Sequence, residues 1–490
     1  MRCIMTREQK YRILKDEDTQ ELKELNNKIN NSKYFQKFHV NPVTGLLNDP
    51  NGFVFFNGKW HLFYQWFPFG GYHGAKNWYH TVSNDLLNFT NEGIGLKIDT
   101  IYDNCGAYSG SAFVENNNLN LVYTGNHRDE NDVRFPYQLV ATLENNNFVK
   151  KDPIISMNSE YTEHQRDPKI IKYNDIYYLT LGAQNHNKKG RLLVYYSNNL
   201  YNNWKLKGEL KISGYDDFGY MWECPDLFKL QDKWVFSFSP QGLKKDGYKY
   251  NNVFQNGYII GQMDFENLEF IVEKDFEELD RGFDFYASQT AFQNKYDTAV
   301  LVSWMGLPDS NYHTENSENF SGCLSLVREL SIIDNTLIQK PIRSIENIKN
   351  SVIFHENTKN YKSKINSPTF INLSNIKSRE FTLKIYYDTQ KDTGFSITYK
   401  NNLFEIKRDM FNIINENQGI TRTIEIYNLD IVDIFIDNSS IEIFINNGVY
   451  TMTSRVFPIE SENTIIYESD IEIDLLIQQL NSCIENNFVL

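Results

Sequence analysis

The sequence is poor in cysteine, in basic residues and in long apolar runs. Five cysteines in 490 residues, with no Cys-x-x-Cys pair among them, cannot form a disulfide framework and make structural zinc unexpected. No apolar stretch is long enough to cross a bilayer, and the first residues lack the apolar segment of a secretory signal. A net charge of -14 argues against nucleic acid or an anionic membrane as the main partner. We therefore expect a soluble, cytoplasmic protein with reduced cysteines.

Signatures of cofactor sites are missing as well. The nine histidines show no metal-binding spacing such as His-Glu-x-x-His, and no glycine-rich phosphate loop is present. The sequence therefore predicts no metal and no cofactor. It gives no indication of the oligomeric state.

Aromatic residues are abundant instead, at 15% of the chain, which fits many short strands. The length suggests two domains. Residues 1–35 are mostly polar, and Leu22, Leu25 and Ile29 recur at helical spacing, so a short amphipathic helix is expected outside the main domain.

The rest of the chain is predicted to be all-β. In residues 36–345, short β-rich runs alternate with turn clusters, which favours a closed architecture such as a propeller, although spacing alone does not exclude a large sandwich. Residues 346–368 are polar with little apolar pattern, so we interpret them as a linker. Residues 369–490 alternate between apolar and polar residues, as expected for a β-sandwich.

The most informative stretch is residues 39–65, HVNPVTGLLNDPNGFVFFNGKWHLFYQ. Its Asn-Asp-Pro-Asn-Gly segment predicts a tight turn, and the Asn57-Gly58 pair predicts a hairpin between two aromatic strands. Asp49 would then lie at the mouth of that hairpin on rigid backbone. Taken alone, such an aspartate usually only caps its own turn.

Two further stretches change this interpretation. They are Gln165-Arg166-Asp167-Pro168 and Trp222-Glu223-Cys224-Pro225-Asp226. Together with NDPNG, they resemble the signature motifs of the β-fructofuranosidases of glycoside hydrolase family 32, which include invertases, sucrose-6-phosphate hydrolases, levanases and inulinases. Residues 437–458 resemble the closing motif of that family's C-terminal domain, so the resemblance covers nearly the whole chain. It implies a five-bladed β-propeller catalytic domain followed by a β-sandwich.

The resemblance also implies a reaction. Cleaving a fructosyl bond with retention needs one ionised carboxyl group and one protonated carboxyl group, roughly 5–5.5 Å apart. By resemblance, Asp49 is the nucleophile, Glu223 the general acid/base and Asp167 the transition-state stabiliser. We expect backbone N–H groups of the turn to lower the pKa of Asp49. Burial beside Trp222 and repulsion from Asp49 should raise the pKa of Glu223.

Further matches imply contacts with the sugar. They are Asn48, Gln65, Trp78, Tyr108, Ser109, Arg166, Tyr286 and Trp304. The alternative for the aromatic members is packing in the core. The chain departs from the family pattern at Tyr108, where phenylalanine is usual, at Tyr79, where glycine is usual, and at Ser288, where proline is usual. Leu46-Leu47 replaces the commoner Trp-Met.

The expected partner is a small sugar, either sucrose or sucrose 6-phosphate, with short fructans as an alternative. A carbohydrate-binding propeller without catalysis would be expected to lack one of the three carboxylates, and all three are present. A phosphorylated substrate would need a basic group at the rim of the pocket. The sequence does not choose among the candidates, which are His127-Arg128, Arg134, Lys188-Lys189, Arg191 and Lys244-Lys245.

Overall fold

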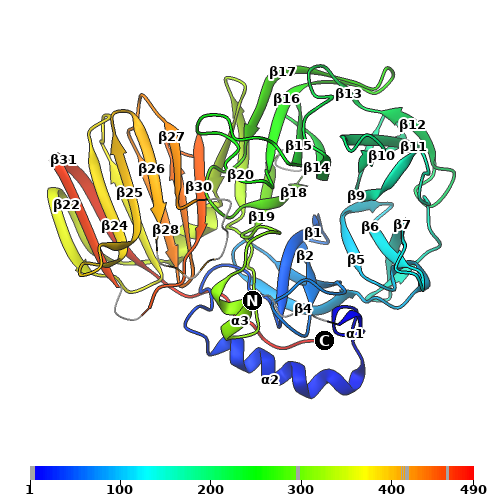
Figure 1. Cartoon of the computed structure of the whole chain (residues 1–490), viewed down its shortest axis with the longest axis horizontal. Helices are drawn as coiled ribbons and strands as arrows, with labels where there is room; N and C mark the ends of the chain where they lie inside the picture. Colours follow the sequence, from blue (N-terminus) through cyan, green and yellow to red (C-terminus); the bar gives the residue numbers. More distant parts are fainter. Residues whose placement is uncertain (1–5, 294–297, 410, 412, 414–418, 460–462) are drawn as a thin grey trace.

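The computed structural model of the chain describes residues 6–293, 298–409, 411, 413, 419–459 and 463–490. It shows a ring of small antiparallel sheets beside a second, layered β domain (Figure 1). This confirms the predicted five-bladed propeller and C-terminal sandwich. In the described part of the chain, no helix has both the length and the apolar character needed to cross a membrane.

Each blade of the propeller is an antiparallel meander in which sequence order is also spatial order. The first blade contains β1 (Leu46–Phe56), β2 (Lys59–Phe67), β3 (Asn77–Ser83) and β4 (Phe89–Leu96). The second contains β5 (Ala107–Glu115), β6 (Asn118–Arg128), β7 (Arg134–Glu144) and β8 (Asn147–Lys150). The third contains β9 (Tyr161–Tyr173), β10 (Ile176–Asn185), β11 (Gly190–Ser197) and β12 (Lys205–Glu209).

The last two blades follow the same plan. The fourth contains β14 (Met221–Leu230), β15 (Lys233–Gln241), β16 (Gly257–Asp264) and β17 (Glu269–Glu278), with β13 (Lys211–Ile212) added in parallel to β17. The fifth contains β18 (Tyr286–Gln293), β19 (Thr298–Trp304), β20 (Arg328–Ile333) and β21 (Thr336–Pro341). The innermost strands β1, β5, β9, β14 and β18 contact one another in turn and so close the ring.

All five innermost strands carry a β-bulge at the same point. In each, two residues oppose one residue of the neighbouring strand, and these pairs are Asn48-Asp49, Tyr108-Ser109, Asp167-Pro168, Cys224-Pro225 and Ala287-Ser288. A bulge interrupts the hydrogen-bond ladder and turns side chains in a new direction. The segment Asn48–Gly52, predicted as a turn, is therefore a bulged part of β1. The error arose because turns and bulges favour the same residue types.

Aromatic side chains fill the wedges between blades. Phe63, Trp78, Leu121 and Tyr123 share one buried cluster between the first two blades. In the fourth blade, the rings of Phe236 and Phe238 stack at 4.5 Å. The high aromatic content is thus explained largely by packing between sheets.

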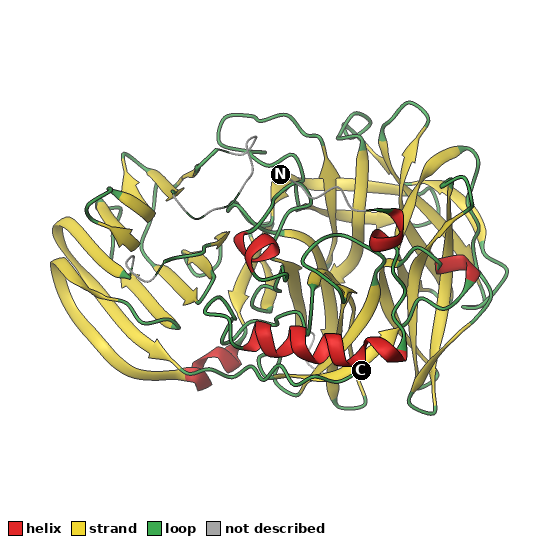
Figure 2. Cartoon of the chain, turned by 60° about the horizontal axis from the view of Figure 1, so that its bottom comes forward, coloured by secondary structure: helices red, strands yellow, loops and turns green. Residues whose placement is uncertain are grey.

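The N-terminal segment lies outside the ring, as predicted, but forms more than one element. It comprises α1 (Arg7–Lys10), the short helix η1 (Asp16–Asp18) and α2 (Thr19–Asn30). Leu22 and Ile29 are buried on the inner face of α2. The Asn26 amide donates to the carbonyl oxygens of Val43 and Asn486. These bonds join α2 to the C-terminal tail, whose end lies close to this helix (Figure 2). Elsewhere in the described residues, short helices are η2 (Ile101–Asp103), α3 (His313–Ser317) and η4 (Arg343–Ile348).

The sandwich is one sheet folded over itself, because the long strand β31 pairs with both β24 and β23. Its core is a cluster rich in isoleucine, leucine and phenylalanine. Its strands are β22 (Lys349–Lys364), β23 (Thr369–Ser374), β24 (Phe381–Asp388), β25 (Thr393–Lys400), β26 (Leu403–Arg408), β27 (Thr421–Glu425), β28 (Val432–Asp437), β29 (Ser440–Ile445), β30 (Tyr450–Arg455) and β31 (Thr464–Leu480).

The interpretation of residues 346–368 as a linker is wrong for most of that stretch, because β22 occupies it and pairs along β31. β22 is an edge strand, and most of its side chains are exposed on both faces. Such a strand has no reason to alternate between apolar and polar residues. The polar composition of β22 is therefore why the sequence did not predict a strand there.

Buried charges join the sandwich to the propeller. The His39 ring lies between Asp437 and Glu442, at 2.8 and 3.0 Å. Arg328 contacts Glu442 at 2.8 Å and Asp280 at 3.1 Å. Asp437 and Glu442 belong to the predicted closing motif, so that motif lies at the domain interface.

Candidate active site

The bulges direct polar side chains into a cavity of about 260 Å³ on the propeller axis. Ten of the predicted site residues line it, namely Asn48, Asp49, Gln65, Tyr108, Ser109, Arg166, Asp167, Glu223, Tyr286 and Trp304. They come from β1, β2, β5, β9, β14, β18 and β19, so the ring brings together residues that are far apart in sequence.

Asp49 is held by side chains from two blades. The Ser109 hydroxyl donates to its Oδ2 at 2.5 Å, and the Asn48 amide donates to its Oδ1 at 3.0 Å. The Gln65 amide in turn donates to Ser109 Oγ at 2.6 Å. Burial raises the pKa of Asp49, the Glu223 charge raises it further, and the bond from Ser109 only partly opposes them. The expected lowering of the Asp49 pKa is therefore wrong.

Glu223 also differs from the expectation. Arg166 donates to Glu223 Oε1 from Nε at 2.9 Å and from Nη2 at 2.5 Å. The Tyr286 hydroxyl donates to Oε2 at 2.5 Å. Burial raises the pKa of Glu223, but the Arg166 charge and the hydrogen bonds outweigh it, so the pKa lies below its usual value. The sequence could not show that Arg166, the neighbour of Asp167 along the chain, would pair with a different carboxylate.

Asp167 occupies the first position of its bulge with a φ of +67°. Its Oδ2 accepts a hydrogen bond from the Cys224 N–H at 2.9 Å, so the third and fourth blades are linked at the site. Burial raises the pKa of Asp167 to about 7, and the opposing charge of Arg166 does not cancel this. At neutral pH this carboxyl group is therefore close to its titration midpoint.

Trp78 does not reach the cavity, although it was predicted to contact the sugar. Its side chain is fully buried, and the indole N–H donates to the Tyr108 carbonyl oxygen at 3.1 Å. Trp78 thus supports the backbone of the β5 bulge from behind. Of the two alternatives for this residue, core packing is the one that fits.

The cavity also contains residues that the sequence did not reveal. Lys76 is buried, and its ammonium donates to Asn48 Oδ1 at 2.6 Å and lies 3.0 Å from His73 Nδ1. Burial lowers the pKa of Lys76 to about 7, although the Asp49 charge opposes this. Lys10 and Tyr11 reach the cavity from the N-terminal segment, where the Lys10 carbonyl oxygen accepts from the Ala75 N–H at 2.8 Å. No helical or strand periodicity marks any of these positions.

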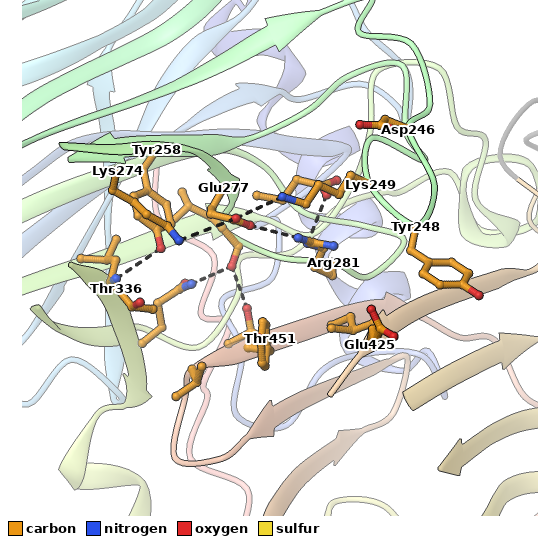
Figure 3. Close-up of a pocket in the computed structure, with 17 residues that line it drawn as sticks. Asp246, Tyr248, Lys249, Tyr258, Lys274, Glu277, Arg281, Thr336, Glu425 and Thr451 are labelled. Carbon is orange, nitrogen blue, oxygen red and sulfur yellow. Dashed lines mark hydrogen bonds and ion pairs between the residues drawn. The ribbon is translucent and has the colours of Figure 1, made fainter. Parts of the chain in front are cut away.

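A second cavity, of about 420 Å³, lies between propeller and sandwich (Figure 3). Several of its charged side chains pair with one another, since Glu277 contacts Lys249 at 3.1 Å and Arg281 at 3.0 Å. The axial cavity, where three carboxylates converge, is therefore the better candidate for catalysis. Among the residues the structure describes, no group of three or more histidine, cysteine, aspartate or glutamate side chains is placed to hold a metal ion.

Comparison with known proteins agrees with this geometry. The family model of the glycosyl hydrolases family 32 N-terminal domain matches residues 39–341, and the family 32 C-terminal model matches residues 335–477. The chain belongs to glycosyl hydrolase family 32. The first match ends with β21, the last strand of the propeller. This family 32 chain is therefore a glycoside hydrolase.

Curated relatives resemble the family 32 chain over most of its length. A sucrose-6-phosphate hydrolase of Staphylococcus xylosus is 38% identical over 476 residues, which is 94% of either chain. One of Bacillus subtilis is 36% identical over 449 residues, covering 89% of this chain and 91% of the relative. Among solved structures, a sucrose-6-phosphate hydrolase of Lactobacillus gasseri superposes with a TM-score of 0.92 at 36% identity, covering 98% of this chain and all of that one.

Proposed function

We propose that this family 32 hydrolase is a retaining β-fructofuranosidase whose substrate is sucrose 6-phosphate. The observation that carries the proposal is the convergence of Asp49, Asp167 and Glu223 from three blades on one cavity. The curated relatives support the phosphorylated substrate, because they are named sucrose-6-phosphate hydrolases. A phosphorylated disaccharide forms where phosphate donors are available, so this substrate favours a cytoplasmic location for the enzyme.

In the first step, an Asp49 carboxylate oxygen bonds to the anomeric carbon of the fructosyl ring. The bond from that carbon to the glucosyl oxygen breaks, and Glu223 gives its proton to this leaving oxygen. Asp167 accepts hydrogen bonds from ring hydroxyls while the ring flattens. In the second step, Glu223 takes a proton from water, the water oxygen bonds to the anomeric carbon, and Asp49 leaves. Two inversions give net retention.

The pKa shifts of these two groups run opposite to their roles in this reaction, since the pKa of Asp49 is raised and that of Glu223 is lowered. Arg166 lines the cavity and keeps Glu223 ionised. We infer that the sugar hydroxyls draw the Arg166 guanidinium away from Glu223. Loss of this ion pair raises the pKa of Glu223, while hydroxyl donors stabilise the charged forms of Asp49 and Asp167. Substrate binding would thus transfer the proton to the acid.

The test compares initial rates on sucrose 6-phosphate and sucrose at matched sub-saturating concentration, across pH. We expect a preference for the phosphorylated sugar of at least about tenfold, equivalent to roughly 1.4 kcal/mol. We also expect the basic limb of kcat to lie at higher pH than that of kcat/KM, because the former reports the sugar-bound site. Basic limbs of kcat and kcat/KM at the same pH would refute the proton transfer. Equal rates on the two sugars would refute sucrose 6-phosphate as the preferred substrate.

Variants test the assigned roles. Glu223→Gln and Asp49→Asn should each reduce turnover by several orders of magnitude while sugar binding, measured by calorimetry, remains. Lys233→Gln is a matched control, because Lys233 forms its ion pair with Glu273 on the outside of the fourth blade. An active Asp49→Asn enzyme would place the nucleophile elsewhere.

A further inference from the structure

A phosphorylated substrate needs a positive charge near the catalytic cavity that is not already neutralised. Most of the basic residues considered from the sequence do not provide one. Lys189 pairs with Asp217 at 2.6 Å, and Arg191 pairs with Glu209 at 3.1 Å. Neither of them lines the catalytic cavity, and the same holds for Lys188, Lys244 and Lys245.

Arg134 does not line the catalytic cavity either, but it contacts a residue that does. It is the first residue of β7, and its guanidinium carbon lies 5.8 Å from the ring centre of Tyr108, which lines the catalytic cavity. Its charge also acts on two other neighbours of the site. Burial raises the pKa of Tyr11, and Arg134 is one of the groups that oppose this. Burial lowers the pKa of His164 to about 4, and Arg166 and Arg134 contribute to the lowering.

The side chain of Arg134 is also unpaired among the described residues. Among the described residues, its guanidinium has no hydrogen bond or ion pair, and its Nε is buried without a partner. Arg128, its partner across the hairpin, differs because it pairs with Asp132 at 3.2 Å. A guanidinium with free N–H groups matches the geometry of phosphate oxygens and can bind two at once.

The location also fits the direction in which the substrate must extend. The leaving glucosyl oxygen has to face Glu223, which is paired with Arg166. His164 lies beyond Arg166, 3.1 Å from its Nη1, and lines with Arg134 a depression of about 540 Å³. The remaining carboxylates there do not block it, since Asp132 is paired with Arg128 and the Glu163 side chain is half exposed. A glucosyl group directed outward from Glu223 therefore passes toward Arg134.

We propose that Arg134 binds the phosphate group of a phosphorylated disaccharide at the rim of the catalytic cavity and so sets the preference for the phosphorylated sugar. This inference rests on the proposed function, since it concerns the same site and substrate. The contact requires no movement of the carboxylates, so hydrolysis of unphosphorylated sucrose should not depend on Arg134.

The experiment measures kcat/KM for sucrose 6-phosphate and for sucrose in Arg134→Gln, Arg134→Lys and the unmodified enzyme. We expect Arg134→Gln to lower kcat/KM for sucrose 6-phosphate by about 10- to 100-fold, mainly through KM, as for loss of a charge-assisted hydrogen bond. The value for sucrose should stay within about twofold, which also shows that the variant folds. Arg134→Lys should recover part of the loss.

Two controls make the assignment specific. Arg343→Gln removes an arginine of η4 whose side chain is 92% exposed, and it should leave kcat/KM unchanged for both sugars. Lys10→Gln removes another cation that lines the cavity and has no ion pair among the described residues. This variant should keep the preference for the phosphorylated sugar if Arg134 sets it.

The outcomes separate this inference from the proposed function. An unmodified enzyme without preference for the phosphorylated sugar overturns the proposed substrate and this inference together. A preference that survives in Arg134→Gln, or that is lost in Lys10→Gln instead, overturns only the role of Arg134. Equal losses on both sugars would mean that Arg134 merely supports Tyr108, which also overturns it.

Discussion

At the scale of single residues, charge balance controls the site. The three carboxyl groups share the cavity with the basic side chains of Arg166, Lys76 and Lys10, and of these groups Asp167 and Lys76 are the most deeply buried. Burial, with the charge of Glu223 added to it, raises the pKa values of Asp49 and Asp167, whereas the charge of Arg166 helps to lower that of Glu223. The three carboxyl groups thus differ in their affinity for protons, and we infer that binding of the sugar changes which of them carries one.

The raised pKa of Asp167 makes a prediction about stability. Its value of about 7 in the folded protein compares with roughly 3.9 in an unfolded chain. The folded state therefore binds this proton more tightly, and stability is lost as pH rises from about 4 to 7, with the full cost present above 7. Asp167→Asn removes that cost. We expect the variant to be inactive but more stable at pH 8 by up to about 2–4 kcal/mol, with the difference disappearing near pH 4.

Denaturant unfolding at pH 4.5 and pH 8 measures this difference. Asparagine suits position 167 because it tolerates the φ of +67°. The control is Asp232→Asn, which changes an exposed aspartate in the β14–β15 hairpin and should show no such pH dependence. A stability difference that does not change with pH would refute the raised pKa of Asp167.

At the scale of elements, the five bulges explain which parts of the site the sequence could reveal. Asp49, Asp167 and Glu223 were predictable because each lies in a distinctive motif at or beside a bulge. Their pKa directions were not, because Arg166 and Ser109 act across blades. Lys76 and Tyr11 were missed because they enter from a loop and from the N-terminal segment. Similarly, the apolar–polar alternation identified the inner strands of the sandwich but not the solvated edge strand β22.

The proline positions show how the bulges are built. Pro168 and Pro225 take the second position of their bulges, where the ladder is interrupted and a missing N–H costs nothing. Ser288 takes the same position in β18. Its N–H has a hydrogen-bond partner, because it donates to Asn256 Oδ1 at 3.2 Å. The departure from the family pattern at Ser288 is thus compensated by a neighbouring side chain.

This compensation predicts coupling between two substitutions. Asn256→Leu leaves the buried Ser288 N–H without a partner and should lower the free energy of unfolding by about 1–3 kcal/mol. Ser288→Pro removes the N–H itself, so Asn256→Leu should cost about 1 kcal/mol less in that background. A double-mutant cycle by denaturant unfolding measures the coupling. Purely additive effects would show that the Ser288 N–H does not depend on Asn256.

At the scale of the whole molecule, the sandwich acts on the site indirectly. The described residues that line the catalytic cavity all lie in the N-terminal segment or the propeller. The sandwich instead supplies Asp437 and Glu442 to the buried interface with His39 and Arg328. Burial lowers the pKa of His39, but its two acidic partners outweigh this and raise it, so the ring favours its charged form. We infer that the sandwich braces the blades that carry the site.

Arg328 provides the sharpest test of this bracing. Its side chain is fully buried and contacts both Asp280 of the propeller domain and Glu442 of the sandwich. Arg328→Met would leave Asp280 without its cation, and Glu442 would keep only His39 as a basic partner. Breaking a buried ion pair by removing one partner costs about 3–5 kcal/mol, because an uncompensated charge stays buried. We expect a loss of that size in denaturant unfolding, with kcat/KM nearly unchanged at temperatures where the variant is folded.

Arg343→Met is the matched control, since Arg343 is 92% exposed and its ion pair with Glu329 is long, at 3.6 Å. It should change stability by less than about 0.5 kcal/mol. If Arg328→Met lowered kcat/KM as much as stability, the interface would be shaping the catalytic cavity directly. If it changed neither, the two domains would be held by their apolar contacts, and the buried charges would not be the brace.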